Sequence, residues 1–426
     1  MAEQLALLGG TPTISRPLAG YQSMGPEEEE AVVRVVRSGV LSAYIGAPGE
    51  GFMGGTEVRA FEQKAAEKFG VKHAIGVNSW TSGLIAAVGA IGVEPGDEII
   101  TTPWTMSATA MAILHWNAIP VFADIDRATF NLDPESVRKN ITPRTRAILA
   151  ADIFGQSADM DSLRAIADEQ NLKLITDTAQ APGSMRTDGY TGTKADIGGF
   201  SLNYHKHIHC GEGGILVTDD DALAEKMCLI RNHAESVIKP EKPEDLANMI
   251  GYNFRMGELE AAIASAQLDK LEHRVTDRQR VASELDAGLA GLDGLTTPFV
   301  APYTSHVYYV YGMILDTQRL GVSRDRIGDA LRAEGIPGVS TSYQNIHRLP
   351  VFTQQIAYGT HGFPWSLRSH ERNFAYGLGT CPVAEELQDQ SYLGLAICMN
   401  QLPSDDVDLI VAAFKKVWAN LESLKD

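Results

Sequence analysis

Short apolar runs alternate with longer amphipathic stretches between residues 56 and 233. The short runs predict buried strands, and the stretches in which apolar residues recur every three or four positions predict helices. Strands separated by helices indicate a mostly parallel sheet covered on both faces, which is an α/β fold. We expect strands at residues 73–77, 98–101, 120–123, 147–154, 172–176, 197–202 and 215–218, and helices at 56–69, 83–91, 106–116, 134–139, 160–170 and 222–233.

The pattern differs toward both ends of the chain. Residues 1–24 are irregular and rich in proline and glycine, so we expect an arm that lies on another surface. Pro26 then opens a helix with a glutamate-rich first turn that ends near Arg37. From about Leu259, apolar residues on one helical face predict a long helix that runs to about Leu292 and links two domains.

The remainder is expected to be a smaller α+β region. Its pattern predicts a strand, a helix, an irregular stretch and a final amphipathic helix, at 307–315, 324–334, 343–350 and 405–424. A chain of 426 residues is too long for one ordinary hydrophobic core. We therefore expect three parts: an arm (1–24), a large α/β domain (25–275), and a linking helix with a small C-terminal α+β domain (276–426).

Composition and charge exclude several functions. The formal net charge of −18 would repel phosphate backbones, and no basic stripe compensates, so we expect no nucleic-acid partner. No apolar run approaches the roughly 20 residues that span a bilayer, and the N-terminus lacks the basic segment of a signal peptide. The four cysteines lie far apart, without a disulfide or zinc-ribbon pattern. We expect a cytoplasmic protein with no membrane partner.

The strongest chemical candidate is Lys206, in the stretch FSLNYHKHIHCGEGGILVTD. Most lysines are solvated surface charges, but Lys206 lies on a glycine-braced turn between two expected strands. Upstream, Asp177 ends an expected strand, where an open α/β sheet presents groups to a ligand. Such a pair suits pyridoxal 5′-phosphate, because the amine can form a Schiff base and the carboxylate can keep the pyridine nitrogen protonated.

Two further stretches fit this cofactor. The turn Asn78-Ser79-Trp80-Thr81-Ser82 joins an expected strand to a helix of small residues, where free amides and a positive helix end can bind a phosphate. An ordinary N-cap would account for this turn equally well. After Asp177, small residues leave space beside the carboxylate, and Gln180 offers an amide for a phenolic oxygen.

Other motifs compete with this interpretation. His205, His207, His209 and Cys210 could form a metal site, although zinc sites usually draw ligands from two separated segments; the histidines could instead be solvated turn residues. A G-x-G-x-x-G pattern within residues 49–54 lacks the strand and acid of a dinucleotide site, so we expect a mobile loop near the substrate. Three weaker candidates are His347, Tyr343 and Tyr376, and a lone histidine is more often structural.

The order of these motifs resembles the DegT/DnrJ/EryC1/StrS family of sugar aminotransferases, a fold-type I branch of pyridoxal-phosphate enzymes similar to aspartate aminotransferase. The resemblance covers about residues 25–420. The motifs that carry it are GVNSWTSGL, GDEIITTPWTMSATA, PVFADID, ADIFGQSADM, LITDTAQAPGS, FSLNYHKHIHCGEGGILVTDD, IRNHA, GYNFRMGELEAAIASAQLDKL and CPVAEEL. The resemblance implies a large pyridoxal-phosphate-binding domain and a smaller C-terminal domain.

By position, the resemblance implies a role for each site residue. Lys206 would be the Schiff-base lysine and proton shuttle, Asp177 would pair with the pyridine nitrogen, and Gln180 would lie against the ring and its phenolic oxygen.

The resemblance also implies a phosphate site. Trp80, through its backbone amide, and Thr81 would bind the phosphate together with the Ser201 hydroxyl. Asn253 would reach the phosphate from a neighbouring subunit, since family members are homodimers with shared active sites.

Three positions depart from the family pattern. Met106 stands where the family usually has an aromatic residue stacked on the ring. Met106 would then contact the cofactor, and the stacking would be weaker or would come from Trp104. Asp152 stands where many members have histidine. The glycine-rich stretch from Gly46 to Gly55 is longer than usual.

The implied reaction moves an amino group from glutamate or glutamine to a nucleotide-activated keto-sugar or to a keto-cyclitol. An alternative is a sugar 3-dehydratase of the same fold, in which a histidine replaces the lysine; the lysine at position 206 favours transamination. Another is a non-catalytic regulatory protein that binds the cofactor. A metal hydrolase built on the histidine run is the remaining alternative.

Overall fold

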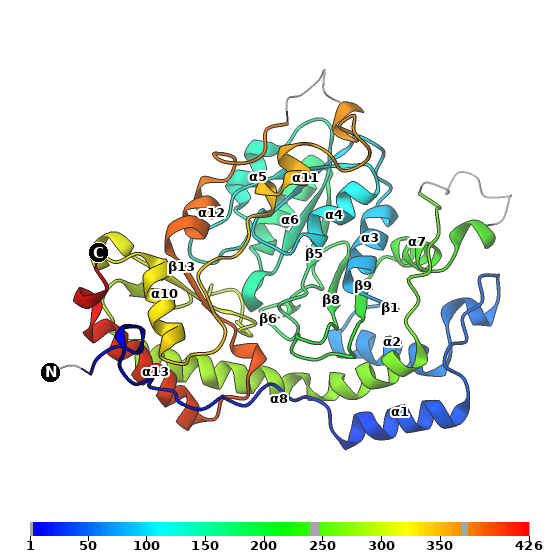
Figure 1. Ribbon diagram of the computed structural model, residues 1–426. Coiled ribbons are helices and arrows are strands. Elements are labelled where there is room, and N and C mark those ends of the chain that lie inside the picture. Colours follow the sequence, from blue (N-terminus) through cyan, green and yellow to red (C-terminus); the bar gives the residue numbers. More distant parts are fainter. Residues whose placement is uncertain (1–2, 239–247, 368–373, 426) are drawn as a thin grey trace.

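A mixed β-sheet forms the centre of the protein (Figure 1). The computed structural model describes residues 3–238, 248–367 and 374–425, so residues 1–2 of the expected arm lie outside the described residues. Two groups of strands, ordered β3-β2-β4-β5 and β8-β9-β1, are joined by a parallel bridge between Ile175 and Ile197. The strands are β1 His73–Val77, β2 Glu98–Thr101, β3 Ile119–Phe122, β4 Thr145–Ala151, β5 Lys173–Asp177, β8 Gly198–Ser201 and β9 Gly214–Thr218.

Within this sheet only β9 runs against its neighbours. β2 to β5 pair in parallel, the Ile175–Ile197 bridge is parallel, and β9 pairs antiparallel with both β8 and β1. The expectation of a mostly parallel α/β sheet is therefore confirmed.

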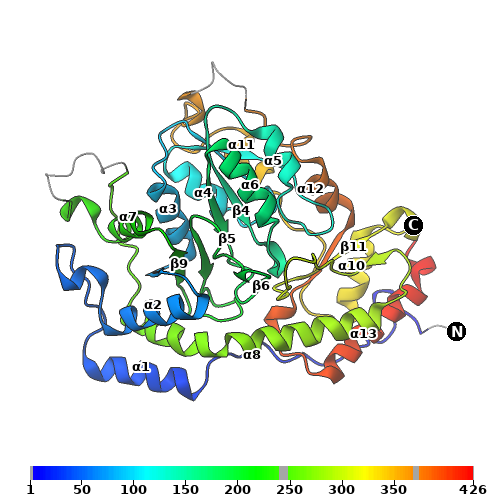
Figure 2. The ribbon, with the colours of Figure 1, turned by 180° about the vertical axis from the view of Figure 1, so that it is seen from behind.

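Helices cover both faces of the sheet, because neighbouring residues of a strand point to opposite sides. Leu216 packs in a cluster with residues of α3 and α7, whereas Ile215 and Val217 pack with residues of α2 and α8. Figure 2 shows the helices behind the sheet as seen in Figure 1. The helices around the sheet are α1 Pro26–Ser38, α2 Thr56–Phe69, α3 Trp80–Ala90, α4 Ala108–His115, α5 Pro134–Asn140, α6 Met160–Gln170, α7 Asp221–Arg231 and α8 Glu258–Leu289.

The long helix α8 contacts two hydrophobic cores. Leu268 and Leu271 pack against the large sheet, whereas Leu285 and Leu289 pack in the core of a second, antiparallel sheet ordered β10-β11-β13-β12. The predicted domain boundary between residues 275 and 276 falls inside α8 and stays a prediction. The remaining elements are β6 Met185–Arg186, β7 Gly189–Tyr190, β10 Leu295–Thr296, β11 Tyr311–Leu315, α9 Thr317–Leu320, α10 Arg324–Ala333, β12 Val339–Ser340, α11 Pro350–Thr353, α12 Pro382–Glu386, β13 Tyr392–Leu395 and α13 Ser404–Ala419.

The N-terminal arm lies against the second core. Leu5 and Ile14 are buried among residues of α10, α13 and β11, and Gly20 forms a bridge with Asn400. Figure 1 shows the arm, in dark blue, running along α13 toward α8. The two ends of the chain therefore meet on this side of the molecule.

Two predicted element boundaries are wrong for local reasons. Helix α3 begins at Trp80 instead of Gly83, because the Ser79 side chain caps it by accepting from the amide of Ser82. Strand β11 begins only at Tyr311, because the residues before it bond to the backbone of 154–155 instead of to the sheet.

We expect Gly199→Ala to destabilise the protein. A Cβ at residue 199 in β8 would lie 2.3 Å from the indole of Trp80 and 2.3 Å from the carbonyl oxygen of Ile215. Overpacking of this kind typically costs about 1–3 kcal/mol of unfolding free energy. Denaturant unfolding measures the cost, with Gly20→Ala as control, since a Cβ at Gly20 meets nothing within 4 Å. Equal stability of the two variants would contradict the packing.

Candidate active site

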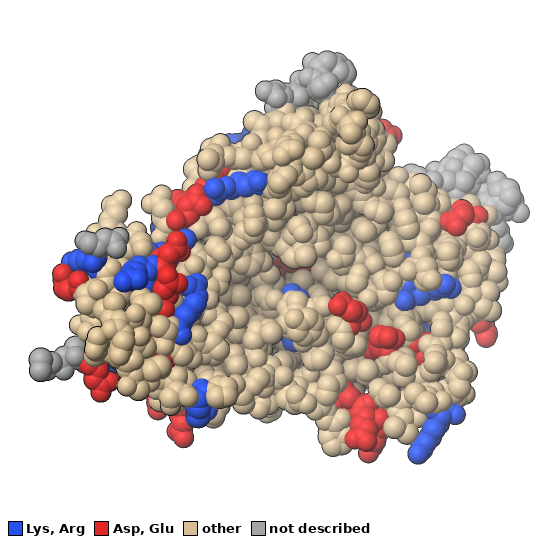
Figure 3. All heavy atoms as spheres, viewed as in Figure 1, with Lys and Arg blue, Asp and Glu red and all other residues tan. Residues whose placement is uncertain are grey.

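One edge of the large sheet collects the predicted site residues. Since β1, β4, β5 and β8 run in one direction, the residues that end or follow them meet at the same edge. Asp152 follows β4, Asp177 ends β5, Ser201 ends β8 and Ser79 follows β1. Because β9 runs in the opposite direction, the β8–β9 connection that carries Lys206 also lies there. In Figure 3 this side of the molecule is hollowed near its centre, and charged atoms of both signs are visible inside the hollow.

The Asp177 carboxylate is oriented by donors from three segments. Its Oδ1 accepts from Trp80 Nε1 over 2.7 Å and from the amide of Ala179 over 3.2 Å, and its Oδ2 accepts from Thr109 Oγ1 over 2.8 Å. The residue is 7% exposed. A carboxylate has about four acceptor positions, so this one can still accept from a ligand.

Lys206 presents a buried amine. The residue is 7% exposed, and its Nζ lies 4.3 Å from the ring centre of Tyr309. Within the part of the chain that the structure describes, Nζ has no hydrogen-bond or ion-pair partner. Burial lowers the pKa of this amine to about 8, and the negative charge of Asp177 acts in the opposite direction. A substantial fraction of the amine is therefore neutral near pH 8.

The other titratable groups around this amine have pKa values far from 8. Burial lowers the pKa of His205 and of His207 to about 4 and raises that of Cys398 to about 11. Burial also raises the pKa of the Tyr309 phenol above its ordinary range. Among these groups, Lys206 is the one that changes charge between pH 6 and 9.

The turn after β1 offers amides to an anion. The Ser79 hydroxyl accepts a hydrogen bond from the amide of Ser82, and the Ser79 carbonyl accepts one from the amide of Gly83. The first two amides of α3, those of Trp80 and Thr81, have no preceding helical turn to bond to. Ser201 Oγ accepts from the amide of Asn203 over 3.2 Å, which leaves its own hydrogen to be donated. These groups form a site suited to a phosphate.

Gln180 has two partners within the protein. Its Oε1 accepts from the amide of Phe154 over 3.0 Å, so its Nε2 faces the Tyr343 hydroxyl and donates to it over 2.9 Å. The predicted contact of this amide with a phenolic oxygen of the ligand stays a prediction. Burial raises the pKa of Tyr343 to about 12, so its hydroxyl keeps its proton.

Met106 and Trp104 differ in exposure. Met106 is 61% exposed, and its sulfur lies 3.1 Å from the amide of Ala108. Trp104 is fully buried and stacks on Tyr343, with ring centres 5.6 Å apart. The expectation that Trp104 could stack on a bound ring is wrong, because an indole with no exposed surface cannot meet a ligand.

Asn253 is exposed and lies beside the phosphate turn of its own chain. Its carbonyl oxygen accepts from Asn78 Nδ2 over 3.3 Å, and its side-chain oxygen accepts from Arg255 Nε over 2.7 Å. Its contribution to the site of a neighbouring subunit stays a prediction.

Among the histidines near Lys206, His205 and His209 are partly exposed, whereas His207 is buried and is not a solvated turn residue, as one alternative held. His207 is 1% exposed and its Nε2 lies 2.7 Å from the carbonyl oxygen of Val307, while His209 Nε2 lies 2.8 Å from Ser23 Oγ. Among the described residues, no group of three or more His, Cys, Asp or Glu side chains is placed to hold a metal ion.

Other candidates from the sequence are structural. His347 is buried and bonded to Glu385 over 3.0 Å. Asp152 is 1% exposed, and its carboxylate accepts from Thr178 Oγ1 over 2.6 Å and from the amide of Ala158 over 2.8 Å. Both side chains therefore join segments of the protein instead of facing the hollow.

The glycine-rich loop is bound to the rest of the chain. Asn232 Nδ2 donates to the carbonyls of Ile45 and Phe52, over 3.1 Å each, so one side chain joins the two ends of this loop.

Two residues that contact the site were not predicted. Tyr309 comes from the segment before β11, and Thr109 lies on α4. The i, i+4 pair of Thr105 and Thr109, whose hydroxyls are 3.0 Å apart, was a signal in the sequence. For Tyr309 the aromatic run at 308–311 was visible, but nothing in it indicated contact with Lys206.

The residues present fit pyridoxal 5′-phosphate. The buried Lys206 amine lacks a hydrogen-bond partner among the described residues, and the Asp177 carboxylate can accept a further hydrogen bond. The amides of Trp80 and Thr81, in the first turn of α3, can donate to an anion. An aldehyde, a basic ring nitrogen and a phosphate match these three groups in chemistry.

Residues 27–389 match the model of the DegT/DnrJ/EryC1/StrS aminotransferase family. The spore coat polysaccharide biosynthesis protein SpsC of Bacillus subtilis is 34% identical over 361 residues, which cover 83% of this chain and 90% of that protein. A putative L-glutamine:3-amino-2,3-dideoxy-scyllo-inosose aminotransferase of Streptoalloteichus tenebrarius is 32% identical over 435 residues, which cover 100% of both chains.

Solved structures show the same fold. The structure of DesI in the presence of its TDP-sugar product has a TM-score of 0.80 and 26% sequence identity, and the match covers 99% of this chain and 97% of that one.

We expect the apoprotein to take up pyridoxal 5′-phosphate at a rate that rises with pH through a midpoint at about pH 8, because only the neutral amine of Lys206 attacks an aldehyde. Tyr309→Leu removes the ring face that stabilises the ammonium, so the midpoint should fall by about 0.5–1.5 pH units. Stopped-flow absorbance measures uptake. Tyr309→Phe is the matched control, which keeps the ring and the midpoint; equal midpoints for the leucine and phenylalanine variants would contradict the contact.

Proposed function

The chain belongs to the DegT/DnrJ/EryC1/StrS aminotransferase family, and from this membership we propose that it transfers an amino group from glutamate or glutamine to the keto group of a sugar or a cyclitol. It is a pyridoxal-phosphate-dependent aminotransferase of fold type I, as its family, relatives and structural neighbours are. The donor and acceptor are the proposed part.

The observation that carries the proposal is the state of Lys206. Its amine is buried at the edge of the sheet where Asp177 and the phosphate turn meet, and it makes no hydrogen bond within the described residues. The 3-dehydratase alternative would have a histidine at this position, and the chain has lysine.

Pyridoxal 5′-phosphate, when bound, supplies an aldehyde that links covalently to amines and a ring that withdraws electrons from the linked carbon. Lys206 Nζ would hold it, take the proton from the α-carbon of the amino donor as a general base and return a proton as a general acid. The Asp177 carboxylate would keep a proton on the ring nitrogen. Trp80 and Thr81 amides with Ser201 would bind the phosphate, and Gln180 would orient the ring.

A polyhydroxylated acceptor suits the surroundings of the amine. The hydroxyls of Tyr343 and Tyr204 lie near that of Tyr309, whose ring contacts Lys206. The Streptoalloteichus relative matches the chain from end to end, and its name pairs glutamine with a cyclitol ketone. This supports a keto-cyclitol acceptor and glutamine as donor. The TDP-sugar named for DesI supports a nucleotide-activated keto-sugar instead.

We expect glutamine or glutamate alone to transfer its amino group to the cofactor on the protein, with release of the 2-oxo acid of the donor and a gain in near-ultraviolet absorbance. Lys206→Ala should lower this conversion at least about 100-fold, because general acid–base catalysis is lost. Lys139→Ala, at an exposed position on α5, is the control and should match wild type. Conversion by Lys206→Ala at the wild-type rate would refute the assignment of Lys206. With the wild-type protein, keto-cyclitol and keto-sugar acceptors can be compared by how far each restores the visible absorbance.

The proposal includes a homodimer with shared active sites. Ile45 and Ile250 are 59% and 62% exposed, and their segments meet at Asn232 and His233: Asn232 bonds to the carbonyl of Ile45, and residue 251 packs on His233. Asn253 pairs with Asn232 in the same region. A second copy of the chain that covered this surface would bring Asn253 near the other site.

Sedimentation of the purified protein should give about twice the chain mass of 46.1 kDa. Replacing both exposed isoleucines by aspartate should shift the protein toward the monomer, because two charges would then be buried in the contact. A wild-type protein that sediments as a monomer would contradict the shared site.

In the described part of the chain, no helix combines the length and apolarity that crossing a bilayer requires.

A further inference from the structure

Both backbone carbonyls that flank Lys206 contact side chains from other parts of the chain. The Tyr21 hydroxyl donates to the carbonyl of His207 over 2.5 Å, and the Cys398 sulfur lies 3.9 Å from the carbonyl oxygen of His205. Tyr21 belongs to the N-terminal arm, and Cys398 follows β13. The position of the lysine turn therefore depends on segments near both ends of the chain.

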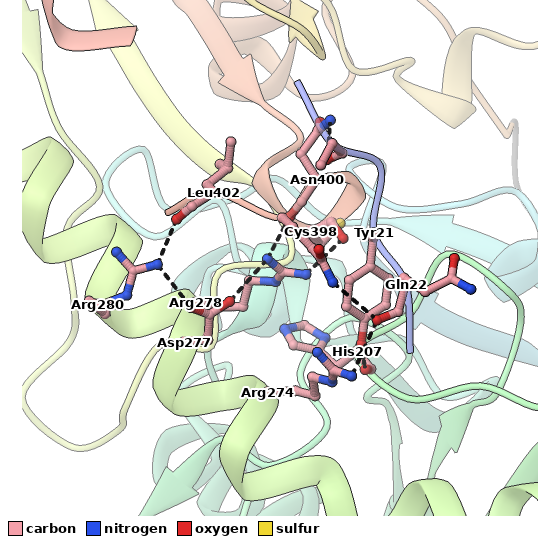
Figure 4. A network of polar contacts seen from close by, with 12 residues as sticks. Tyr21, Gln22, His207, Arg274, Asp277, Arg278, Arg280, Cys398, Asn400 and Leu402 are labelled. Atoms are coloured by element: carbon pink, nitrogen blue, oxygen red, sulfur yellow. Dashed lines mark hydrogen bonds and ion pairs between the residues drawn. The ribbon is translucent and has the colours of Figure 1, made fainter. Parts of the chain in front are cut away.

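Tyr21 is itself held in place by α8. Its ring lies 5.3 Å from the guanidinium carbon of Arg274 and 4.8 Å from that of Arg278, and its amide donates to the carbonyl of Met399 over 2.9 Å. Figure 4 shows this ring beside both arginines, with its hydroxyl directed at His207. Cation–π contacts with two guanidinium groups and a backbone bond leave the ring little freedom.

Arg278 links the two contacts. It is 1% exposed, and it donates to the carbonyls of Cys398 and Asn400 over 3.1 and 2.9 Å. Its closest carboxylate, that of Asp277, lies 3.7 Å from Nη1. The same side chain therefore packs against the ring of Tyr21 and fixes the backbone of Cys398, the two residues that contact the lysine turn.

The Tyr21 hydroxyl remains a donor. Burial raises the pKa of Tyr21, although Arg274 and Arg278 act in the opposite direction, so the phenol keeps its proton at neutral pH. Within the turn, Lys206 donates its amide to Asn203 over 3.0 Å, Cys210 donates to Leu202 over 3.0 Å, and Asn203 Nδ2 donates to Glu212 over 2.8 Å. None of these bonds involves the carbonyls of His205 and His207, so contacts from other segments hold these two carbonyls.

We propose that Tyr21 is a positioning residue for Lys206, and that the N-terminal arm sets the depth at which the reactive amine is buried. The inference rests on the proposed function, because it takes Lys206 as the reacting amine. Without the bond from Tyr21, the His207 carbonyl would turn toward water and carry the neighbouring lysine with it. A displacement of about 1 Å at a reacting group can lower a rate about 100-fold.

The test is Tyr21→Phe, which keeps the ring between the arginines and removes the bond to His207. We expect the half-reaction with glutamine to slow about 10- to 100-fold. We also expect the pH midpoint of pyridoxal 5′-phosphate uptake by the apoprotein to rise by about half a unit to one unit, because a less buried lysine moves toward its ordinary pKa. The groups facing the amine are unchanged in this variant: Asp177, Cys398, Tyr309, His205 and His207.

Ser23→Ala is the matched control. It removes the arm's other bond to this turn, Ser23 Oγ to His209 Nε2 at 2.8 Å, without touching a carbonyl that flanks Lys206. Ser23→Ala should have the same melting temperature as Tyr21→Phe, and its pH midpoint of cofactor uptake should equal that of the wild type. A Tyr21→Phe protein with the wild-type midpoint, or one that changes only in step with Ser23→Ala, would overturn the proposal. If wild type takes up the cofactor but does not react with glutamine or glutamate, the proposed function fails, whereas the comparison of uptake midpoints still decides the role of Tyr21.

Discussion

The burial of one amine is the constraint on which the site depends. An ammonium group loses much of its hydration inside a protein, and the loss favours the neutral form. Lys206 is nearly enclosed, and the structure surrounds it with the Asp177 charge and the face of Tyr309 instead of a direct ion pair. An ion pair would hold the proton on the amine, whereas these weaker influences leave it able to gain and lose a proton near neutral pH.

Much of this arrangement could be predicted from the sequence. The strand pattern alone places Asp177 at a strand end and Lys206 between two strands, and parallel strand direction brings both to one edge. The pattern shows which residues face inward, but it does not show which distant segments cover them. For this reason the sequence prediction missed Tyr309, and it wrongly offered His207 as a solvated residue, although Val307 before β11 and Tyr21 of the N-terminal arm contact His207.

Boundaries of elements were predicted less well where side chains compete with the backbone. The cap formed by Ser79 starts α3 three residues earlier than the small-residue pattern indicated, which turns Trp80 into a helical residue whose indole reaches Asp177. The residues expected to bind phosphate are thus at the first turn of a helix. No rule of periodicity contains that information, because it depends on one hydroxyl.

The contact between the arm and the C-terminal region has a consequence for biosynthesis. Gly20 and Tyr21 pair with Asn400 and Met399, so the arm meets its partner only after the segment around residue 400 has been synthesised. The large sheet can assemble earlier, since β9 completes it by residue 218. It follows that the protein passes through a state in which the sheet is formed while the lysine turn still lacks its outer support.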